Sequence, residues 1–133
     1  MPYFYLYDSY LSDRAYVTQL IRLENTLADL GIQGRVGKLT LLKSIKDILA
    51  SALRDGADTI VAVGNDLTLS RLIEVLAPTP NITLGFIPLG ADNQVLGEIL
   101  GIPTGLLACQ IISSRTVAKL TVGKINDQYF IQS

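Results

Sequence analysis

The chain has 133 residues, which fits a single domain and leaves no room for a second full one. It has no histidine and one cysteine, Cys109, so histidine-based triads, histidine-ligated metals and thiolate zinc sites are excluded. Its 11 basic and 12 acidic residues give a net charge of −1 without a basic run, which argues against a nucleic-acid partner. The lone cysteine, the lack of a leader pattern and apolar stretches too broken for a transmembrane segment predict a cytoplasmic location.

The first part of the chain alternates between strand-like and helical patterns. Tyr3–Tyr7 predicts a strand, and Ser12 is a suitable N-cap for a helix that Gly31 ends. The apolar residues of this helix are Val17, Leu20, Ile21, Leu27 and Leu30. Gln33–Val36 predicts a short second strand.

A helix with strong apolar periodicity follows the second strand. Thr40 is its predicted N-cap, and Gly56 marks its end. Its inward positions follow the helical repeat and are Leu41, Ile45, Ile48, Leu49 and Ala52. The continuous apolar run Thr59–Val63 predicts a central strand that is covered on both faces.

A third helix is predicted after Gly64, and Pro78 ends it because proline lacks the backbone N–H that a helix needs. Its inward residues are Leu69, Leu72, Ile73 and Leu76. Ile82–Ile87 predicts a fourth strand, followed by a short helix that reaches Leu100. Thr104 is the predicted cap of one more helix, which ends near Ser113.

The last residues change in character and predict an antiparallel hairpin from Val117–Val122 and Tyr129–Ile131. The whole order predicts an α/β fold: a three-layer open parallel sheet of Rossmann-like type with a C-terminal β-hairpin. We place the α/β domain at residues 1–115 and the hairpin at 116–133. Ligands of such sheets bind beyond the carboxyl ends of the strands, so the loops after the third and fourth strands are the expected site.

Those two loops carry the most specific motifs of the sequence. Residues 64–68 read Gly-Asn-Asp-Leu-Thr, residues 88–94 read Pro-Leu-Gly-Ala-Asp-Asn-Gln, and residues 100–103 read Leu-Gly-Ile-Pro. Together they resemble the diacylglycerol kinase catalytic domain family, which includes sphingosine-kinase-like enzymes and is related to NAD kinases. That family shows Gly-Gly-Asp-Gly-Thr and Pro-Leu-Gly-Thr-Gly-Asn-Asp at the two loops. The resemblance implies the family's nucleotide-binding domain for residues 1–115 and the start of its second, β-rich domain for the hairpin.

The resemblance also implies ATP and Mg²⁺ as ligands, because the family's glycine-rich loop wraps the nucleotide phosphates with backbone N–H groups. The implied nucleotide-binding residues are Thr40, Gly64, Asn65, Asp66, Thr68, Gly90 and Asn93. The implied metal ligand is Asp66. Each residue also has a plain structural alternative, since Asp, Asn and Thr cap helices and glycine allows tight turns.

Several departures from the family pattern predict a degenerate site. Leu67 replaces a glycine, where a positive φ costs roughly 1 kcal/mol or more. Asp92 replaces another glycine and places a carboxylate beside the expected phosphate. Ala91 lacks a hydroxyl and Gln94 lacks a carboxylate, while residues 8–10 read Asp-Ser-Tyr in place of the family's Asn-Pro-x-Ser-Gly. We therefore expect a lipid-kinase-like domain with weak or no turnover by this chain alone.

Two other functions stay open. One is a phosphotransferase completed by a partner chain that carries the lipid-binding domain, and the other is a non-enzymatic scaffold that self-associates. Hairpin edges pair readily with another chain, so a homodimer through Ala118–Phe130 is expected. Lys38, Lys43 and Lys46 are interpreted as a solvated face, with phosphate contact as the alternative. The tyrosines of the first strand and Tyr10 are interpreted as packing residues, with base stacking as the alternative.

Overall fold

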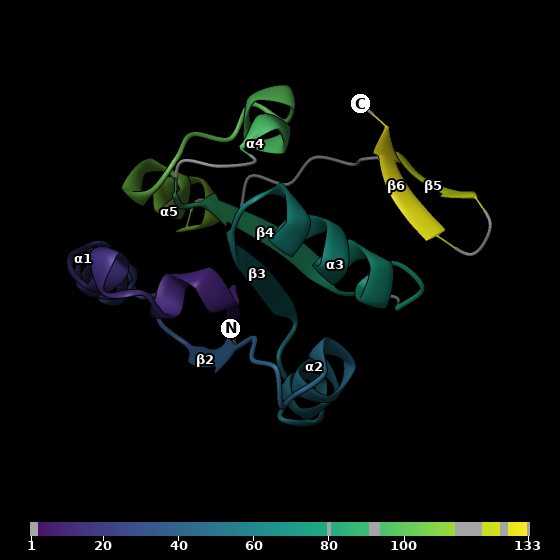
Figure 1. Cartoon of the computed structure of the whole chain (residues 1–133), viewed down its shortest axis with the longest axis horizontal. Coiled ribbons are helices and arrows are strands. Elements are labelled where there is room, and N and C mark those ends of the chain that lie inside the picture. Colours follow the sequence, from purple (N-terminus) through teal and green to yellow (C-terminus); the bar gives the residue numbers. More distant parts are fainter. Residues whose placement is uncertain (1–2, 80, 91–93, 114–120, 126–127, 133) are drawn as a thin grey trace.

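The computed structural model describes residues 3–79, 81–90, 94–113, 121–125 and 128–132. Its centre is a parallel sheet whose strands are β1 (Tyr3–Tyr7), β2 (Arg35–Lys38), β3 (Thr59–Gly64) and β4 (Thr83–Pro88). The strand order is β2-β1-β3-β4, so the chain reverses its direction of progress across the sheet between β2 and β3. Figure 1 labels β2, β3 and β4 of this sheet. All four carboxyl ends therefore lie along one edge of the sheet.

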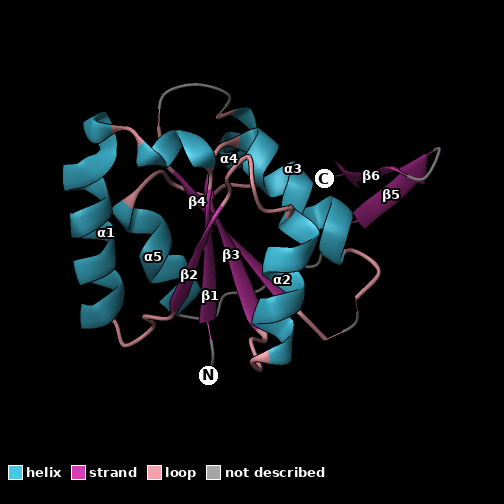
Figure 2. Ribbon diagram, turned by 60° about the horizontal axis from the view of Figure 1, so that its bottom comes forward, coloured by secondary structure: helices cyan, strands magenta, loops and turns pink. Residues whose placement is uncertain are grey.

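Helices cover both faces of this sheet. The first face carries α1 (Val17–Asp29) and α5 (Leu106–Ser113), and the second carries α2 (Ile45–Arg54) and α3 (Asp66–Leu76) (Figure 2). A five-residue helix, α4 (Val95–Ile99), follows the loop after β4. The predicted three-layer α/β fold is confirmed.

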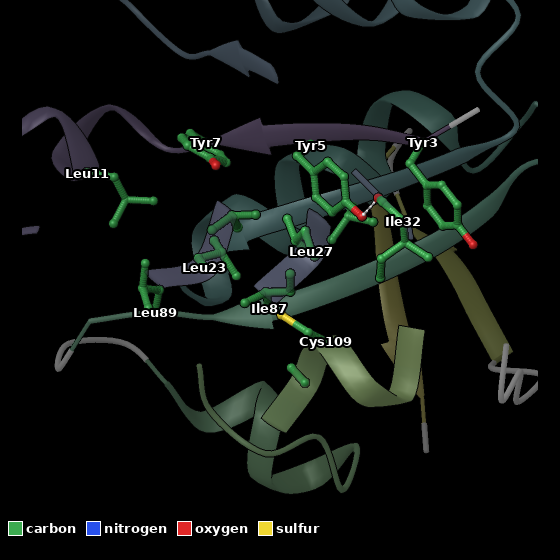
Figure 3. Packing of buried hydrophobic residues seen from close by; sticks show 13 residues of the cluster. Tyr3, Tyr5, Tyr7, Leu11, Leu23, Leu27, Ile32, Ile87, Leu89 and Cys109 are labelled. Carbon is green, nitrogen blue, oxygen red and sulfur yellow. Dashed lines mark hydrogen bonds between the residues drawn. The ribbon is translucent and has the colours of Figure 1, made fainter. Parts of the chain in front are cut away.

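Two cores result because successive side chains of a strand point to opposite faces. Tyr3, Tyr5 and Tyr7 of β1 face α1 and α5, where they pack with the aliphatic residues shown in Figure 3. Phe4 and Leu6 face α2 and α3. The hydroxyl of Tyr5 donates to the Ile32 carbonyl oxygen at 2.5 Å, and that of Tyr7 donates to the Glu24 carboxylate at 3.1 Å. The interpretation of these tyrosines as packing residues is confirmed.

The start of the first helix differs from the prediction. Two 3-10 turns, Ser9–Ser12 and Arg14–Tyr16, precede α1, and Asp13 rather than Ser12 caps the second of them by accepting from the Ala15 N–H at 2.9 Å. Ser12 as an N-cap was wrong. Of the apolar residues of α1, Val17 and Ile21 are more than half exposed. Leu23 and Leu27 of the same helix are buried, and the helix orientation that buries them turns Val17 and Ile21 toward solvent.

The second helix also begins later than predicted. Ser44 is its N-cap, with Oγ accepting from the Asp47 N–H at 3.2 Å, so Thr40 as the cap was wrong. Leu41 lies before the helix and is fully exposed, which overturns its assignment to the buried face. The preceding strand is shifted by two residues, because pairing with β1 places Arg35 opposite Phe4.

The predicted C-terminal hairpin is confirmed, since β5 (Thr121–Ile125) pairs antiparallel with β6 (Gln128–Gln132). Its first strand continues to Ile125, beyond the predicted end at Val122. The β6 backbone lies beside α3 (Figure 1). Residues 117–120 of the predicted first hairpin strand lie outside the described residues, as do residues 118–120 and 126–127 of the proposed dimer segment. Among the described helices, none combines the length and apolar character needed to cross a membrane.

The first core predicts a loss of stability at alkaline pH. Burial raises the pKa of the Cys109 thiol from 9.0 to about 11, and burial raises the pKa of Tyr5 and Tyr7 above their usual range. Each folded-state pKa lies above the unfolded value, so the unfolded chain releases these protons first. For Cys109, the contribution of the buried thiol to the free energy of unfolding is therefore complete below pH 9.0 and is lost as the pH rises through about 11.

Urea unfolding at about pH 7 and about pH 10.5 measures this loss. The Cys109→Ala variant is the control, because it removes one of the three titrating groups and should lose less of its own stability over the same interval. A free energy of unfolding that stays constant across this range would contradict the prediction.

Candidate functional site at the carboxyl edge of the sheet

The loops after β3 and β4 lie side by side at the carboxyl edge. Gly64 pairs with Pro88 at the ends of the two strands, and the Leu89 N–H donates to the Gly64 carbonyl oxygen at 2.8 Å. The side-chain amide of Gln94 reaches back to the same place, donating to the carbonyl oxygens of Gly64 at 3.0 Å and of Leu89 at 3.1 Å. The two loops predicted to form the site therefore lie next to each other.

A hydrogen-bonded cap organises the first loop. The Asn65 side chain accepts from the N–H groups of Leu67 and Thr68 at 3.0 and 3.3 Å, and the Thr68 hydroxyl accepts from the Asn65 N–H at 3.0 Å. This capping box starts α3. A Cβ on Gly64 would stand 2.2 Å from Thr68 Oγ1, so the glycine is needed for the close approach of this side chain.

The Thr68 hydroxyl also ties the first loop to the end of β1. It is fully buried and donates to the Asp8 carboxylate at 2.6 Å. Asp8 is itself buried, and its other oxygen accepts from the Ser9 N–H at 2.6 Å. A carboxylate removed from water is costly unless it is hydrogen-bonded, so this pair stabilises the end of β1 and the start of α3 together.

The second loop is covered by aromatic side chains. Gly90 has φ +106°, a conformation that favours glycine, and a Cβ there would approach the Tyr10 ring at 3.1 Å. The Tyr10 hydroxyl donates to the Leu89 carbonyl oxygen, and its ring meets that of Tyr16 edge to face with centroids 5.5 Å apart. The 3-10 turns after β1 therefore pack directly on the loop.

Asp66 connects two helix starts. It is the first residue of α3, and its carboxylate oxygens accept from the N–H groups of Val95 and Leu96 at 2.9 Å each. These are the first N–H groups of α4, which lack partners within their own helix. The protein's own carboxylate thus occupies the position at α4 where a bound anion would receive the same hydrogen bonds.

The family model described as "Diacylglycerol kinase catalytic domain" matches residues 11–125, which is most of the chain. The chain belongs to the diacylglycerol kinase catalytic domain family. Among curated relatives, diacylglycerol kinase of Staphylococcus saprophyticus is 36% identical over 84 residues, covering 62% of this chain and 27% of the relative. That of Staphylococcus haemolyticus is 37% identical over 82 residues, covering 60% and 24%. The match thus spans about a quarter of each relative's length.

The fold is also that of solved structures. The crystal structure of a diacylglycerol kinase from Bacillus anthracis str. Sterne matches 97% of this chain and 44% of its own, with a TM-score of 0.77 and 23% identity. The diacylglycerol-kinase-type fold therefore extends through almost all of this chain.

The structure brings together most of the predicted site residues of this family. Gly64, Asn65, Asp66 and Thr68 lie in the first loop and the start of α3, next to Gly90 in the second loop. Thr40 follows β2, on the far side of β1 from that pair, where its hydroxyl accepts from the N–H groups of Leu42 and Lys43. Asn93, together with Ala91 and Asp92, lies outside the described residues.

The backbone strain predicted at Leu67 is not present in the structure. Leu67 has no positive φ, because it lies in the first turn of α3 with its side chain half exposed. It therefore carries none of the backbone strain expected of it. Three residues that shape the site were missed as members of it: Asp8, Tyr10 and Gln94. The sequence named all three only as departures or packing residues, and their long-range partners gave no local signal.

A metal ion would have few protein ligands here. The described residues contain no cluster of three or more Asp, Glu or Cys side chains that could hold one. Mg²⁺ in nucleotide sites usually binds one or two carboxylates and completes its shell with phosphate and water. Asp66 fits that role, since each of its oxygens has a lone pair beyond the hydrogen bond it accepts.

Replacing Thr68 by valine tests the buried hydroxyl. Valine keeps the shape but removes the donor to one buried oxygen of the Asp8 carboxylate, so we expect a loss of about 2 kcal/mol in the free energy of unfolding. The matched control is Thr18→Val on the exposed face of α1, expected to change it by less than about 0.5 kcal/mol. Equal effects of the two substitutions in urea unfolding would contradict the assigned hydrogen bond.

Replacing Gln94 by glutamate tests the link between the loops. The new carboxylate faces two carbonyl oxygens and donates to neither, so we expect a loss of about 2 kcal/mol relative to the exposed control Gln110→Glu. Acidification protonates the new carboxyl and restores a donor, so the difference between the two variants should shrink at low pH. A difference that does not depend on pH would argue against this geometry.

Proposed function

We propose that this protein is a lipid-kinase-like domain that binds a Mg²⁺-nucleotide phosphate between the loops after β3 and β4, with weak or no turnover by itself. The observation that carries the proposal is the meeting of Gly64 and Leu89 at the carboxyl edge of a parallel sheet. This is the position at which open α/β sheets bind ligands. Membership of the diacylglycerol kinase catalytic domain family supports ATP as the nucleotide.

Each proposed residue has a physical role in such a complex. Gly64 and Gly90 let the backbone come close to a phosphate, and Asn65 and Thr68 fix the loop that presents it. Asp66 holds Mg²⁺, which supplies the positive charge that phosphoryl transfer requires. Thr40 and Asn93 are the remaining proposed contacts, at the ends of β2 and of the second loop.

Weak turnover follows from the hydrogen bonds already present. The N–H groups of Leu67 and Thr68 bind Asn65, and those of Val95 and Leu96 bind Asp66. A phosphate can use these groups only by displacing a side chain that already satisfies them. Part of the binding free energy is then used to displace these side chains, so the nucleotide binds more weakly. Its phosphate is also held less firmly in the geometry that transfer requires.

A thermal-shift titration with Mg-ATP, Mg-ADP and NAD tests the proposal. Ligand at about 100 times its dissociation constant adds about 2.7 kcal/mol to stability, so a bound nucleotide raises the melting temperature measurably. We expect Mg-ATP to act, and Asp66→Asn to lose the part of the shift that requires Mg²⁺. Glu74→Gln, an exposed acid on the same helix, is the matched control.

Each variant is compared with its own ligand-free melting temperature, because Asp66→Asn also weakens the cap of α4. No shift of the unmodified protein with any nucleotide would overturn the proposal and favour the self-associating scaffold, which light scattering would detect as a dimer.

A phosphotransferase completed by a partner chain is the second candidate. The match covers 27% and 24% of the two Staphylococcus kinases. Reconstitution with a separate chain that supplies the remainder would then restore transfer of phosphate from ATP to diacylglycerol. Activity that stays absent in the mixture would reject this candidate.

A further inference from the structure

The loop between β2 and α2 exposes two adjacent leucines. Leu41 is 106% exposed and Leu42 is 96% exposed, the two most exposed large apolar side chains among the described residues. They are not part of either core, although the sequence around them has helical periodicity. Leucine side chains at this exposure gain nothing from the fold itself, because they bury no apolar surface. We call residues 41 and 42 the leucine tip.

Local hydrogen bonds hold the leucine tip away from the protein. The Thr40 hydroxyl accepts from the N–H groups of Leu42 at 3.2 Å and Lys43 at 3.3 Å, which closes a turn around the two leucines. Leu39, just before this turn, is buried, and its N–H donates to the Tyr7 carbonyl oxygen at 2.9 Å. Ser44 caps α2 just after it. The leucines thus protrude from a loop anchored at both ends.

Lysines flank the leucine tip in the sequence. Lys38, Lys43 and Lys46 are exposed, and Asp47 is the one acid between residues 38 and 47. Three lysines and one aspartate leave a local charge of +2, against −1 for the whole chain. Apolar side chains flanked by lysines are the arrangement that binds the interface of a membrane with anionic lipids.

The size and shape of the leucine tip favour a bilayer over a protein partner. A stable protein interface buries roughly 800 Å² on each partner, which is far more than two leucine side chains provide. A bilayer needs no matching pocket, because its interface accepts a small apolar protrusion while the lysines meet phosphate headgroups.

We infer that the leucine tip inserts into the interface of a membrane that contains anionic lipids, with Lys38, Lys43 and Lys46 facing the headgroups. The loop follows β2, so it leaves the same edge of the parallel sheet as Gly64 and Gly90. A membrane bound there lies on the side of the protein that carries the candidate site. The inference rests on the loop alone and does not require nucleotide binding.

Co-sedimentation of the full chain with vesicles tests the inference. We expect binding to vesicles of phosphatidylcholine mixed with phosphatidylglycerol, and much weaker binding to phosphatidylcholine alone. The double variant Leu41→Ser, Leu42→Ser should lower the partition coefficient by about tenfold or more. Lys43→Gln and Lys46→Gln should each lower it about fivefold, and added salt should reduce the binding of the unmodified protein.

The matched control is Val17→Ser, Ile21→Ser, which removes two exposed apolar side chains from α1. It should leave vesicle binding unchanged. No binding of the unmodified protein to anionic vesicles, or equal losses in the two double variants, would overturn the inference. The thermal shift with Mg-ATP, measured on the same variants, separates this result from a failure of the nucleotide proposal.

Discussion

The buried hydroxyl of Thr68 links the ends of β1 and β3 at the carboxyl edge of the sheet, and the rest of the site depends on this link. Thr68 donates to the Asp8 carboxylate at the end of β1 and accepts from the Asn65 N–H at the end of β3. The contact exists because Gly64 has no side chain to keep Thr68 away. It fixes the point at which β3 turns into α3, and with it the position of Asp66. Through Asp66, it also sets the start of α4.

Side chains at this edge bind neighbouring backbone groups, although the buried Oε1 of Gln94 has no hydrogen-bond partner. Asn65 and Asp66 accept from backbone N–H groups that an anion would otherwise bind. The Gln94 amide donates to two backbone carbonyl oxygens, and Tyr10 covers the second loop. In an efficient enzyme, the backbone N–H groups of a phosphate-binding loop are preorganised to donate to the ligand. The diacylglycerol kinase fold is therefore preserved here with an edge whose hydrogen bonds are directed inward, and any ligand competes with the protein's own side chains.

The same edge also carries Leu41 and Leu42, the most exposed large apolar side chains among the described residues. The strands bring the leucine tip and the two glycine loops to one end because all four run parallel. Buried strands and helices explain most of the apolar content of the sequence, but they do not explain Leu41 and Leu42. Apolar residues held outside the core by an ordered turn point to a surface role rather than to a packing role.

The sequence by itself determined the order of elements, the sheet interior and the two glycine loops, since apolar periodicity and glycine-rich turns are local properties. Thr59–Val63 and the inward face of α3 were predicted from such patterns. Only the tertiary structure decided the start of α1 and α2, the exposure of Leu41 and the partners of Asp8 and Gln94. The partners of Asp8 and Gln94 are distant in sequence, because Thr68 lies 60 residues from Asp8 and Gly64 lies 30 residues from Gln94. Helical periodicity cannot distinguish a buried leucine from one that a threonine turn holds in solvent, because the difference lies in which neighbours the folded chain brings to it.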